Sequence, residues 1–444
     1  MSAAAPLGEE IATVSALTHE GEGVVRAGKT VFVAGALPGE RIRLRRTRRH
    51  RQHDEGELLE VLEASPARVE PRCPHFGVCG GCALQHLAAS AQLQAKETEL
   101  RDTLARVARV SPREWLAPLA GPAWGYRRRA RLGARFVHKK GRVLVGFRER
   151  AAPYVAELGG CAVLAAPAGE LIAPLAALLT RLSIREQLPQ VEVAVADNAT
   201  ALTLRVLAAP SPQDLAALAE FAATHAVRLY LQPGGLPSVR ALAGADGEAE
   251  PLHYRLRASG IELAFSPTDF IQVNGPVNEA LVERAAELLA PTAISTVLDL
   301  YCGIGNFTLA LARRAARVVG VEGEQALVDR ARDNARRNAI ANADFHRADL
   351  AVTPDGRREW LRGPYSHVLL DPPRTGARAL LASLAALAPQ RLLYISCHPG
   401  SLARDLEVLV HEHGFTLAAA GVVDMFPHTA HVESLALLTA PGNA

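Results

Sequence analysis

A cysteine at the end of an apolar run is the residue of this 444-residue chain that is best placed to do chemistry. Cys397 follows the run Leu392–Ile395 in the segment YISCHPGSLARD, and the turn-forming sequence His398-Pro399-Gly400 comes next. A thiol at the point where a buried strand gives way to a turn lies at the edge where open α/β sheets bind ligands. Most strand-end cysteines only pack, so this one is a candidate nucleophile if neighbouring motifs support it.

A second strand-end corner has the pattern of a cofactor site. In LDLYCGIGNFT, Gly303 and Gly305 allow a tight turn and a close approach of the backbone to a ligand. Glu322 ends the next strand, where a carboxylate can accept hydrogen bonds from both ribose hydroxyls. Position 308 is Thr, so the third glycine of the dinucleotide fingerprint is missing, which favours S-adenosylmethionine over NAD. Asp349 ends the third strand and is placed to reach an adenine.

Both corners lie in a segment where strand and helix patterns alternate. The strand-like runs are TVLDLY, VVGVE, ADFHRA, SHVLLD and RLLYIS, with helical patterns between them. This alternation predicts an α/β fold with a doubly wound, largely parallel sheet. Right-handed crossovers bring the carboxyl ends of such strands to one edge, where HVLLDPPRTGA forms a third corner. A cofactor and Cys397 are therefore expected to share one crevice.

The preceding part of the chain predicts two further folding units. Residues 8–65 contain short strand-like runs separated by Gly and Pro, which is typical of a small β-barrel, a fold that often binds oligonucleotides. Residues 90–108 predict an amphipathic helix, and residues 123–265 mix strand and helix patterns as an α+β domain does. Two or three domains are also what the chain length leads us to expect.

Charge and composition narrow the class of protein. The net charge is only +3, but arginine is concentrated in RIRLRRTRRHRQH (41–53) and GYRRRARLGAR (125–135). Two separate arginine-rich runs favour a nucleic-acid partner over a solvated surface. No apolar run is as long as a membrane span, and MSAAAPLGEEIATV lacks the features of a secretion signal. A cytoplasmic protein without a membrane partner or disulfides is therefore expected.

Four of the six cysteines form a second candidate site. Cys73, Cys79 and Cys82 are separated by five and then two residues, and Cys161 follows at a distance. In a cytoplasmic chain, thiols this close indicate a metal or redox centre. Zinc more often binds two CxxC pairs, whereas three clustered thiolates with a distant fourth are common for a 4Fe-4S cluster. We favour iron–sulfur over zinc on ligand softness and spacing.

Several motifs together resemble the RNA uracil-5-methyltransferase family. In the family's order, they are DFIQVN (269–274), LDLYCGIGNFTL (298–309), VEG (321–323), DPPR (371–374), ISCHP (395–399) and FPHTAHVES (426–434). The N-terminal strands are similar to a TRAM domain, and the cysteine spacing is similar to the cluster of the ribosomal RNA branch. The tRNA branch has neither feature. The resemblance covers nearly the whole chain and favours the ribosomal branch.

The resemblance implies roles for the matching residues. Cys397 matches the nucleophile, and Glu433 matches the base that accepts a proton. The positions that match S-adenosylmethionine-binding residues are Gln272, Tyr301, Asn306, Glu322 and Asp371, with Asp349 on the adenine side. The cluster ligands are Cys73, Cys79, Cys82 and Cys161. Two positions depart from the family pattern, since His398 stands where Asn is usual and Tyr301 where Phe is frequent.

The resemblance also implies a domain plan and a function. The plan is a TRAM-like, RNA-binding barrel at 1–66, a central α+β domain with the 4Fe-4S cluster at 67–90 and 123–262, a helix packing on the catalytic domain at 91–122, and a Rossmann-like methyltransferase domain at 263–444. The implied reaction is transfer of a methyl group from S-adenosylmethionine to carbon 5 of a specific uridine in 23S ribosomal RNA. It would pass through a covalent cysteine–uracil intermediate in a monomeric, cytoplasmic enzyme.

Three alternatives stay open at this point. The same chemistry could act on a different uridine, in tRNA or elsewhere in ribosomal RNA. DPPR is also similar to the motif of amino-methylating enzymes, although Arg follows the prolines here and those enzymes need no cysteine. A non-catalytic iron–sulfur RNA-binding protein would need neither Cys397 nor Glu433. Covalent trapping on 5-fluorouridine RNA separates uracil-5 methylation from the last two alternatives, and mapping 5-methyluridine in ribosomal RNA from a deletion strain identifies the target nucleotide.

Overall fold

The computed structural model describes residues 8–242, 250–356 and 358–441. Residues 1–7 of the segment assessed above for a secretion signal lie outside this description, as do 243–249 of the predicted central domain and 357 and 442–444 of the predicted methyltransferase domain. The chain divides into two compact units. The first comprises residues up to Glu99 with Phe147–Ala156 and Phe426–His431, and the second comprises Leu100–Gly146, Glu157–Met425 and the chain from Val432 onward. No helix in the described residues is long and apolar enough to span a membrane.

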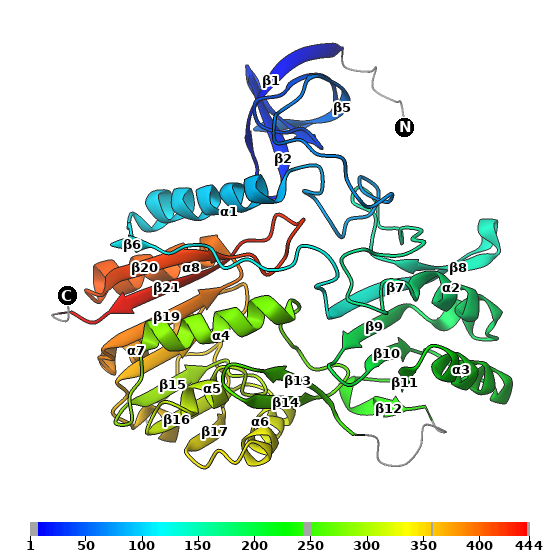
Figure 1. Cartoon of the computed structure of the whole chain (residues 1–444). Coiled ribbons are helices and arrows are strands. Elements are labelled where there is room, and N and C mark those ends of the chain that lie inside the picture. The colour runs from blue at the N-terminus through cyan, green and yellow to red at the C-terminus, as the bar shows by residue number, and fades with distance from the viewer. Residues whose placement is uncertain (1–7, 243–249, 357, 442–444) are drawn as a thin grey trace. The chain divides into compact units, whose positions relative to one another are not determined.

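The N-terminal strands close into a barrel, which confirms the predicted small β-barrel (Figure 1). Its strand order is β1-β2-β3-β5-β4, and only the pairing of β3 with β5 is parallel. Alternate residues such as Val31, Val33, Ile42 and Leu44 point inward and form its core. The strands are β1 (Glu9–Leu17), β2 (Glu22–Ala27), β3 (Lys29–Ala34), β4 (Arg41–Arg49) and β5 (His53–Glu63).

The first arginine-rich run forms β4, and its outward-facing side chains make ion pairs with neighbouring strands. The pairs are Arg41–Glu63, Arg43–Glu60, Arg45–Glu57, Arg46–Glu10, Arg46–Asp54 and Arg48–Glu55. Residues 8–66 contain nine Lys and Arg against ten Asp and Glu, a net charge of −1. The run is therefore largely compensated within the barrel, which sequence reasoning did not anticipate. RNA binding by this run stays a prediction.

A mixed sheet in the second unit matches the predicted central α+β domain. Its order is β12-β11-β10-β9-β7-β8, in which β10 and β11 are parallel and the other pairs are antiparallel. Helix α2 (Ile172–Arg181) packs on β8, and α3 (Pro212–Thr224) packs on β11. The strands are β7 (Arg129–Val137), β8 (Arg142–Gly146), β9 (Gln190–Val195), β10 (Thr200–Arg205), β11 (Val227–Gln232) and β12 (Arg240–Ala241).

Two arginines of the second arginine-rich run pair with one buried carboxylate. Arg129 and Arg131 on β7 both pair with Glu192 on β9, at 2.8 and 3.1 Å. Glu192 is 4% exposed, so this pairing balances a charge inside the sheet. Much of this run therefore serves to assemble the central sheet.

A hairpin that sequence reasoning did not resolve follows this sheet. It consists of β13 (Leu252–Leu256) and β14 (Ile261–Phe265), joined through Gly260 in a left-handed conformation. Asn334 of α6 (Gln325–Arg337) anchors it by accepting a hydrogen bond from Ala264 N and donating one to Ala264 O. The hairpin leads through the DFIQVN segment into α4 (Gly275–Leu289). The position of Gln272, which lies between β14 and α4, is therefore set by the elements on either side of it.

The predicted doubly wound α/β fold is confirmed in the rest of the second unit (Figure 1). The sheet order is β17-β16-β15-β18-β19-β21-β20-β6, and β17, β16, β15, β18 and β19 are parallel. β21 runs antiparallel between β19 and β20. The strands are β6 (Glu114–Trp115), β15 (Thr296–Leu300), β16 (Arg317–Glu322), β17 (Ala343–Arg347), β18 (His367–Leu370), β19 (Arg391–Ser396), β20 (Thr416–Val423) and β21 (Glu433–Thr439).

The parallel strands β15, β16, β18 and β19 are buried on both faces, which explains why their sequences read as largely apolar runs, whereas the edge strand β17 is partly exposed. Helices connect them in the predicted order. The helices not yet given are α1 (Ala89–Thr103), α5 (Thr308–Ala312), α7 (Leu381–Ala386) and α8 (Pro399–Glu407). The short 3₁₀ and π turns are η1 (Leu104–Ala108), η2 (His138–Lys140), η3 (Arg185–Gln187), η4 (Leu236–Ser238), η5 (Glu359–Leu361), η6 (Arg378–Leu380) and η7 (Val408–Glu412).

Candidate active site

The register of two antiparallel strands brings the predicted nucleophile and base together. Cys397 directly follows β19, and Glu433 is the first residue of β21. Ser396 pairs with Ser434, so the next step of the same register places Cys397 opposite Glu433. Glu433 is 7% exposed and Cys397 is half-buried. A thiol and a carboxylate therefore stand opposite each other at the carboxyl edge of the sheet.

The surroundings of Cys397 act on its thiol in opposite directions. Burial raises the pKa of the Cys397 thiol, and the nearby carboxylates of Glu433 and Asp371 raise it further. The guanidinium of Arg374, in the DPPR motif, lowers it. The thiolate is the reactive form, so Arg374 is the side chain that favours reactivity here.

His398, which departs from the family pattern, has a definite structural task. Its side chain caps α8, because His398 Nδ1 accepts a hydrogen bond from Ser401 N at 3.1 Å. Asn is among the best N-cap residues, and it stabilises a helix by accepting the same kind of bond. The histidine therefore replaces an Asn without loss of the cap that starts the helix after Cys397.

The backbone of the glycine corner closes around Glu322. Gly303 and Gly305 have φ values of 54° and 98°, and Tyr301 also adopts a left-handed conformation at 65°. Gly303 N donates to Glu322 Oε2 at 3.1 Å, while Gly323 N and Glu324 N donate to Oε1 at 2.6 and 3.1 Å. The carboxylate that ends β16 is thereby fixed against the turn that ends β15.

A buried carboxyl that sequence reasoning missed lies beside this corner. Asp299 of β15 is 0% exposed and accepts a hydrogen bond from Thr308 Oγ1. Burial raises the pKa of Asp299 to about 7, and the charges of Asp371 and Glu322 add to this effect. Within the described residues, Asp299 Oδ1 has no hydrogen-bond partner. The signal was available in the sequence, since Asp299 interrupts the apolar strand TVLDL.

Two further predicted cofactor residues contact each other. Gln272 Nε2 donates to Asp371 Oδ2 at 3.4 Å, although the two residues are far apart in sequence. Desolvation by the surrounding protein raises the pKa of Asp371 to about 7. Gln272 follows the hairpin β13–β14 and Asp371 follows β18, so the fold brings the DFIQVN and DPPR motifs to one place.

The remaining predicted cofactor residues are held by local bonds. The Asn306 side chain exchanges hydrogen bonds with Asn278 of α4 at 2.9 Å, and its Oδ1 also accepts from Tyr254 Oη at 2.9 Å. Tyr301 Oη donates to Leu350 O at 3.1 Å. Asp349 is exposed, and its Oδ1 accepts from Ala351 N. Asn306 thus anchors the glycine turn to α4 and the hairpin.

This donor set fits S-adenosylmethionine. The bound form of that cofactor carries a sulfonium and an ammonium, and the corner gathers the carboxyl groups of Asp299, Glu322 and Asp371. Asp299 Oδ1 is a buried acceptor without a partner in the described part of the chain, as expected next to a cationic ligand. Glycines at the turn allow the backbone to approach that ligand closely.

The clustered cysteines lie in a tightly folded loop of the first unit. Cys79 Sγ accepts a hydrogen bond from Gly81 N at 3.4 Å, and Cys73 N donates to Gln85 Oε1 at 3.1 Å. A Cβ at Gly80 would lie 2.9 Å from Arg148 O, so the loop packs closely on its neighbour. Cys161 belongs to the second unit. Among the described residues, no three His, Cys, Asp or Glu side chains are arranged to hold a metal, and the predicted cluster stays a prediction.

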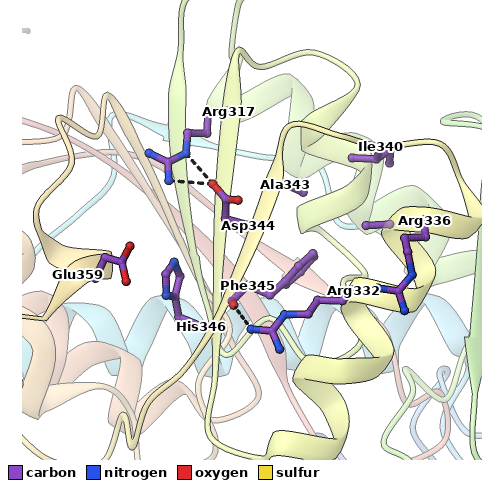
Figure 2. A pocket seen from close by; sticks show the side chains of 10 residues that line it. Arg317, Arg332, Arg336, Ile340, Ala343, Asp344, Phe345, His346 and Glu359 are labelled. Carbon is purple, nitrogen blue, oxygen red and sulfur yellow. Dashed lines mark hydrogen bonds and ion pairs between the residues drawn. The ribbon is translucent and has the colours of Figure 1, made fainter.

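A separate polar pocket, with a cavity volume of about 420 Å³, lies by the first residues of β16 and β17 (Figure 2). Arg317 forms an ion pair with Asp344 across it, and Arg332 of α6 donates to Phe345 O. No predicted site residue lines it. Parallel α/β sheets bind ligands at the carboxyl ends of their strands, so this pocket is distinct from the cofactor corner.

Comparison with known proteins agrees with the fold and with the family that the motifs resemble. The family model described as tRNA (Uracil-5-)-methyltransferase matches residues 250–440. The chain is 49% identical over 426 residues to the 23S rRNA (uracil(1939)-C(5))-methyltransferase RlmD of Stenotrophomonas maltophilia K279a, covering 95% of each chain. It is 48% identical over 425 residues to the RlmD of Alkalilimnicola ehrlichii, covering 96% of this chain and 95% of that one.

A solved structure with the same fold is the Pyrococcus abyssi tRNA (uracil-54, C5)-methyltransferase in complex with S-adenosyl-L-homocysteine. It aligns with a TM-score of 0.75 and 23% identity, covering 97% of this chain and 99% of that one. The fold is thus that of a methyltransferase with an added barrel and central domain. The chain belongs to the RNA uracil-5-methyltransferase family, which confirms the resemblance carried by its motifs.

Proposed function

We propose that this protein transfers a methyl group from S-adenosylmethionine to carbon 5 of one uridine in 23S ribosomal RNA. The target is the uridine that corresponds to position 1939 in the names of its relatives. The observation that carries the proposal is the register of β19 and β21, which sets Cys397 opposite Glu433 at the edge where the cofactor corner opens. The 49% identity to ribosomal RNA enzymes over 95% of the chain favours this substrate over tRNA.

The reaction needs both a nucleophile and a base. Carbon 5 of uracil is too poor a nucleophile to take a methyl group directly. In the proposed reaction the Cys397 thiolate forms a bond to carbon 6, and the displaced electron pair makes an enolate that is nucleophilic at carbon 5. Bound S-adenosylmethionine would supply the electrophilic methyl group to carbon 5 and leave as S-adenosylhomocysteine. Glu433 then takes the proton from carbon 5, the double bond re-forms, and the bond to sulfur breaks to release the thiolate.

The remaining site residues are proposed to hold the cofactor. Glu322, fixed by three backbone N–H groups, is assigned to the ribose, and Asp349 to the adenine side. Gln272 and Asp371 are assigned to the same cofactor pocket, where their mutual hydrogen bond holds them together. Tyr301 forms part of the pocket wall. Asn306, already bonded to Asn278 and Tyr254, contributes by fixing the glycine turn.

The four cysteines, Cys73, Cys79, Cys82 and Cys161, are proposed to bind a 4Fe-4S cluster. Support comes from the spacing of Cys73, Cys79 and Cys82 and from the Gly81 N–H donated to the sulfur of Cys79. Thiolate ligands favour iron–sulfur or zinc, and zinc is the alternative for this site. The domain plan, with an RNA-binding TRAM-like barrel and a helix at 91–122 packing on the catalytic domain, belongs to the same proposal. So does a monomer acting in the cytoplasm, where ribosomal RNA is modified.

The proposal is tested by mapping 5-methyluridine in 23S ribosomal RNA from a deletion strain. The strain is complemented with the wild-type gene or with Cys397→Ala. Methylation at the uridine equivalent to 1939 should return with the wild type only. Methylation restored at another uridine would correct the substrate, and restoration by Cys397→Ala would contradict the covalent mechanism. A denaturant-stable adduct of the wild type on 5-fluorouridine RNA would exclude a non-catalytic RNA-binding role.

A further inference from the structure

Asp405 is a buried carboxylate that no step of the proposed reaction uses. It lies on α8, the helix after Cys397, and is 0% exposed. Its Oδ2 accepts hydrogen bonds from Tyr394 Oη and from Ala377 N, both at 2.7 Å. Tyr394 is on β19, three residues before Cys397, and Ala377 ends the loop 371–377 that follows β18. One carboxylate oxygen therefore ties the nucleophile's strand and helix to the loop that carries the DPPR motif.

The contact between this loop and α8 is close and specific. Gly376 has φ +81°, and a Cβ added there would lie 2.5 Å from Asp405 Oδ2. Only glycine therefore fits at this point. Arg404 donates to Thr375 O at 2.7 Å, so α8 holds the loop by hydrogen bonds at Thr375 and Ala377, on either side of its close approach to Gly376. Gly376 N donates to Pro373 O at 2.9 Å, which closes a turn around Arg374.

The position of Arg374 matters for the charge balance at Cys397. The charged groups that act on the thiol are Glu433 from β21 and Asp371 and Arg374 from the loop, while His398 follows Cys397 and caps α8. Both carboxylates oppose formation of the thiolate, and Arg374 favours it. Arg374 is exposed, and an exposed cation that moves freely is screened by water and salt. Its effect thus depends on a loop backbone that stays in place.

We propose that Asp405 is a positioning residue that holds loop 371–377 in place relative to the strand and helix on either side of Cys397, and thereby fixes the position of Arg374. Arg404 assists from the surface of α8 through its bond to Thr375 O. The inference rests on the proposed function, because it takes Cys397 as the nucleophile. The proposal assigns to the loop-side face of α8 a role in activating the Cys397 nucleophile, in addition to packing.

The test measures the pH dependence of Cys397 alkylation by iodoacetamide in the full-length protein, read by mass spectrometry of the Cys397 peptide. Arg374→Gln and Asp405→Asn should each move the midpoint of alkylation upward by about half a pH unit or more, a change of about 0.7 kcal/mol in thiolate stability. The double variant should shift no further than Arg374→Gln alone, because both changes act through one guanidinium. If Asp405 served only in packing, Asp405→Asn would lower the unfolding temperature without moving the midpoint of Cys397 alkylation.

A surface variant and a buried control keep the test decisive. Arg404, whose side chain is 43% exposed, can be changed to Gln with little risk to folding. In Arg404→Gln the midpoint of Cys397 alkylation should move upward by less than in Asp405→Asn. Tyr394→Phe removes one bond to Asp405 but leaves the bond from Ala377 N, so it should mainly lower the unfolding temperature. Wild-type midpoints in folded Asp405→Asn and Arg404→Gln would overturn the proposal. If Asp405→Asn does not fold, an unchanged midpoint in Arg404→Gln overturns it.

This readout is independent of methyl transfer. If Cys397→Ala still methylates RNA, the proposed function fails whatever the alkylation profiles show. If Cys397→Ala is inactive but the midpoints do not move, the nucleophile assignment holds and the role of Asp405 fails. The two failures are therefore distinguishable.

Discussion

Glu433 lies opposite Cys397 across the antiparallel pair β21 and β19, one step beyond the pair Ser434 and Ser396. The proposed reaction needs a thiolate first and a base last, and these positions put both groups at one edge of the sheet. Because the carboxylate is buried and the thiol is half-buried, the surrounding protein limits access of water to both. This relationship gives the most direct test of the mechanism.

Replacing Glu433 with Gln should stall the reaction after methyl transfer. The Gln side chain keeps the shape but cannot take the carbon 5 proton, so the cysteine cannot leave. We expect turnover to fall by at least about 10²-fold and a methylated RNA–protein adduct to survive denaturing gel electrophoresis. The adduct should vanish in the Glu433→Gln, Cys397→Ala double variant. Normal turnover in the single variant, or no adduct despite binding of RNA and cofactor, would show that Glu433 is not the base.

The second cysteine of the catalytic sheet provides a matched control for the first. Cys302 is 4% exposed, and burial raises its pKa well above the usual thiol value, so it is an inert packing residue. Cys302→Ala should retain methylation and lose about 1 kcal/mol of stability from the small cavity. Cys397→Ala should abolish methylation while S-adenosylhomocysteine affinity, measured by calorimetry, stays near normal. Loss of methylation in a folded Cys302→Ala protein with normal cofactor affinity would contradict this division of roles.

Cofactor affinity should rise with pH through neutrality. The pKa of Asp371 is raised to about 7, so the carboxyl is largely protonated at pH 6 and ionised at pH 8. Because a cationic ligand favours the ionised form, S-adenosylhomocysteine, which keeps the ammonium, should bind roughly three- to tenfold more tightly at pH 8 than at pH 6. Calorimetry measures this dependence. It should flatten in Asp371→Asn, whereas an unchanged slope would exclude Asp371 as its source.

In the cofactor-free protein, the Asp371 carboxyl makes folding stability fall as pH rises, whereas it makes cofactor affinity rise. The unfolded carboxyl titrates near 3.8 and the folded one near 7, so the folded protein binds more protons between these values. This contribution is fully present below pH 3.8 and is lost as pH rises through 7. Asp299, whose pKa is also raised to about 7, acts in the same direction. The unfolding temperature of the cofactor-free protein should therefore depend less on pH in Asp371→Asn.

Local sequence signals were enough to predict most of the fold. The central catalytic strands β15, β18 and β19 are largely apolar runs because they are buried on both faces, and the barrel strands alternate because only one face is buried. The glycine corner could also be read directly, since Gly303 and Gly305 stand where the chain needs positive φ. The hairpin β13–β14 was not resolved, although Leu252, Tyr254 and Leu256 alternate with polar residues in a strand-like pattern.

Non-local contacts were not predictable from one sequence. The register that sets Cys397 opposite Glu433 is determined by pairing between strands that are distant along the chain. Asp299 stands out in sequence only as an acid within an apolar strand, and its burial and its bond to Thr308 come from the fold. Asp405 reads as an ordinary acid in sequence, and only its burial and its bonds to Tyr394 and Ala377 distinguish it. The arginines of β4 read as a free positive surface because the glutamates that pair with them lie on β5.

The ion pairs of the barrel lead to a prediction with a matched pair of variants. If arginines of β4 contact RNA, Arg43→Gln with Arg45→Gln should weaken binding and flatten its salt dependence, because phosphate contacts release counterions. Removing their acidic partners with Glu60→Gln and Glu57→Gln should strengthen RNA binding. Exposed pairs contribute about 0–1 kcal/mol each, so both variants should fold. Filter binding over a salt series measures the RNA affinity of both double variants. If both bind RNA as tightly as the wild-type protein, these ion pairs serve the structure of the barrel alone.

The cysteine site leads to a prediction about metal content. Anaerobically purified protein should be brown and contain about four irons and four labile sulfides per chain, as expected for a cluster with four cysteine ligands. Cys79→Ser should lose the cluster, because hydroxyl oxygen is a harder ligand than thiolate. Cys302→Ala, at a buried thiol outside the site, is the control and should keep it. The cluster-free protein should unfold at a lower temperature yet retain S-adenosylhomocysteine affinity. Stoichiometric zinc without iron or sulfide would show that the site is a zinc centre.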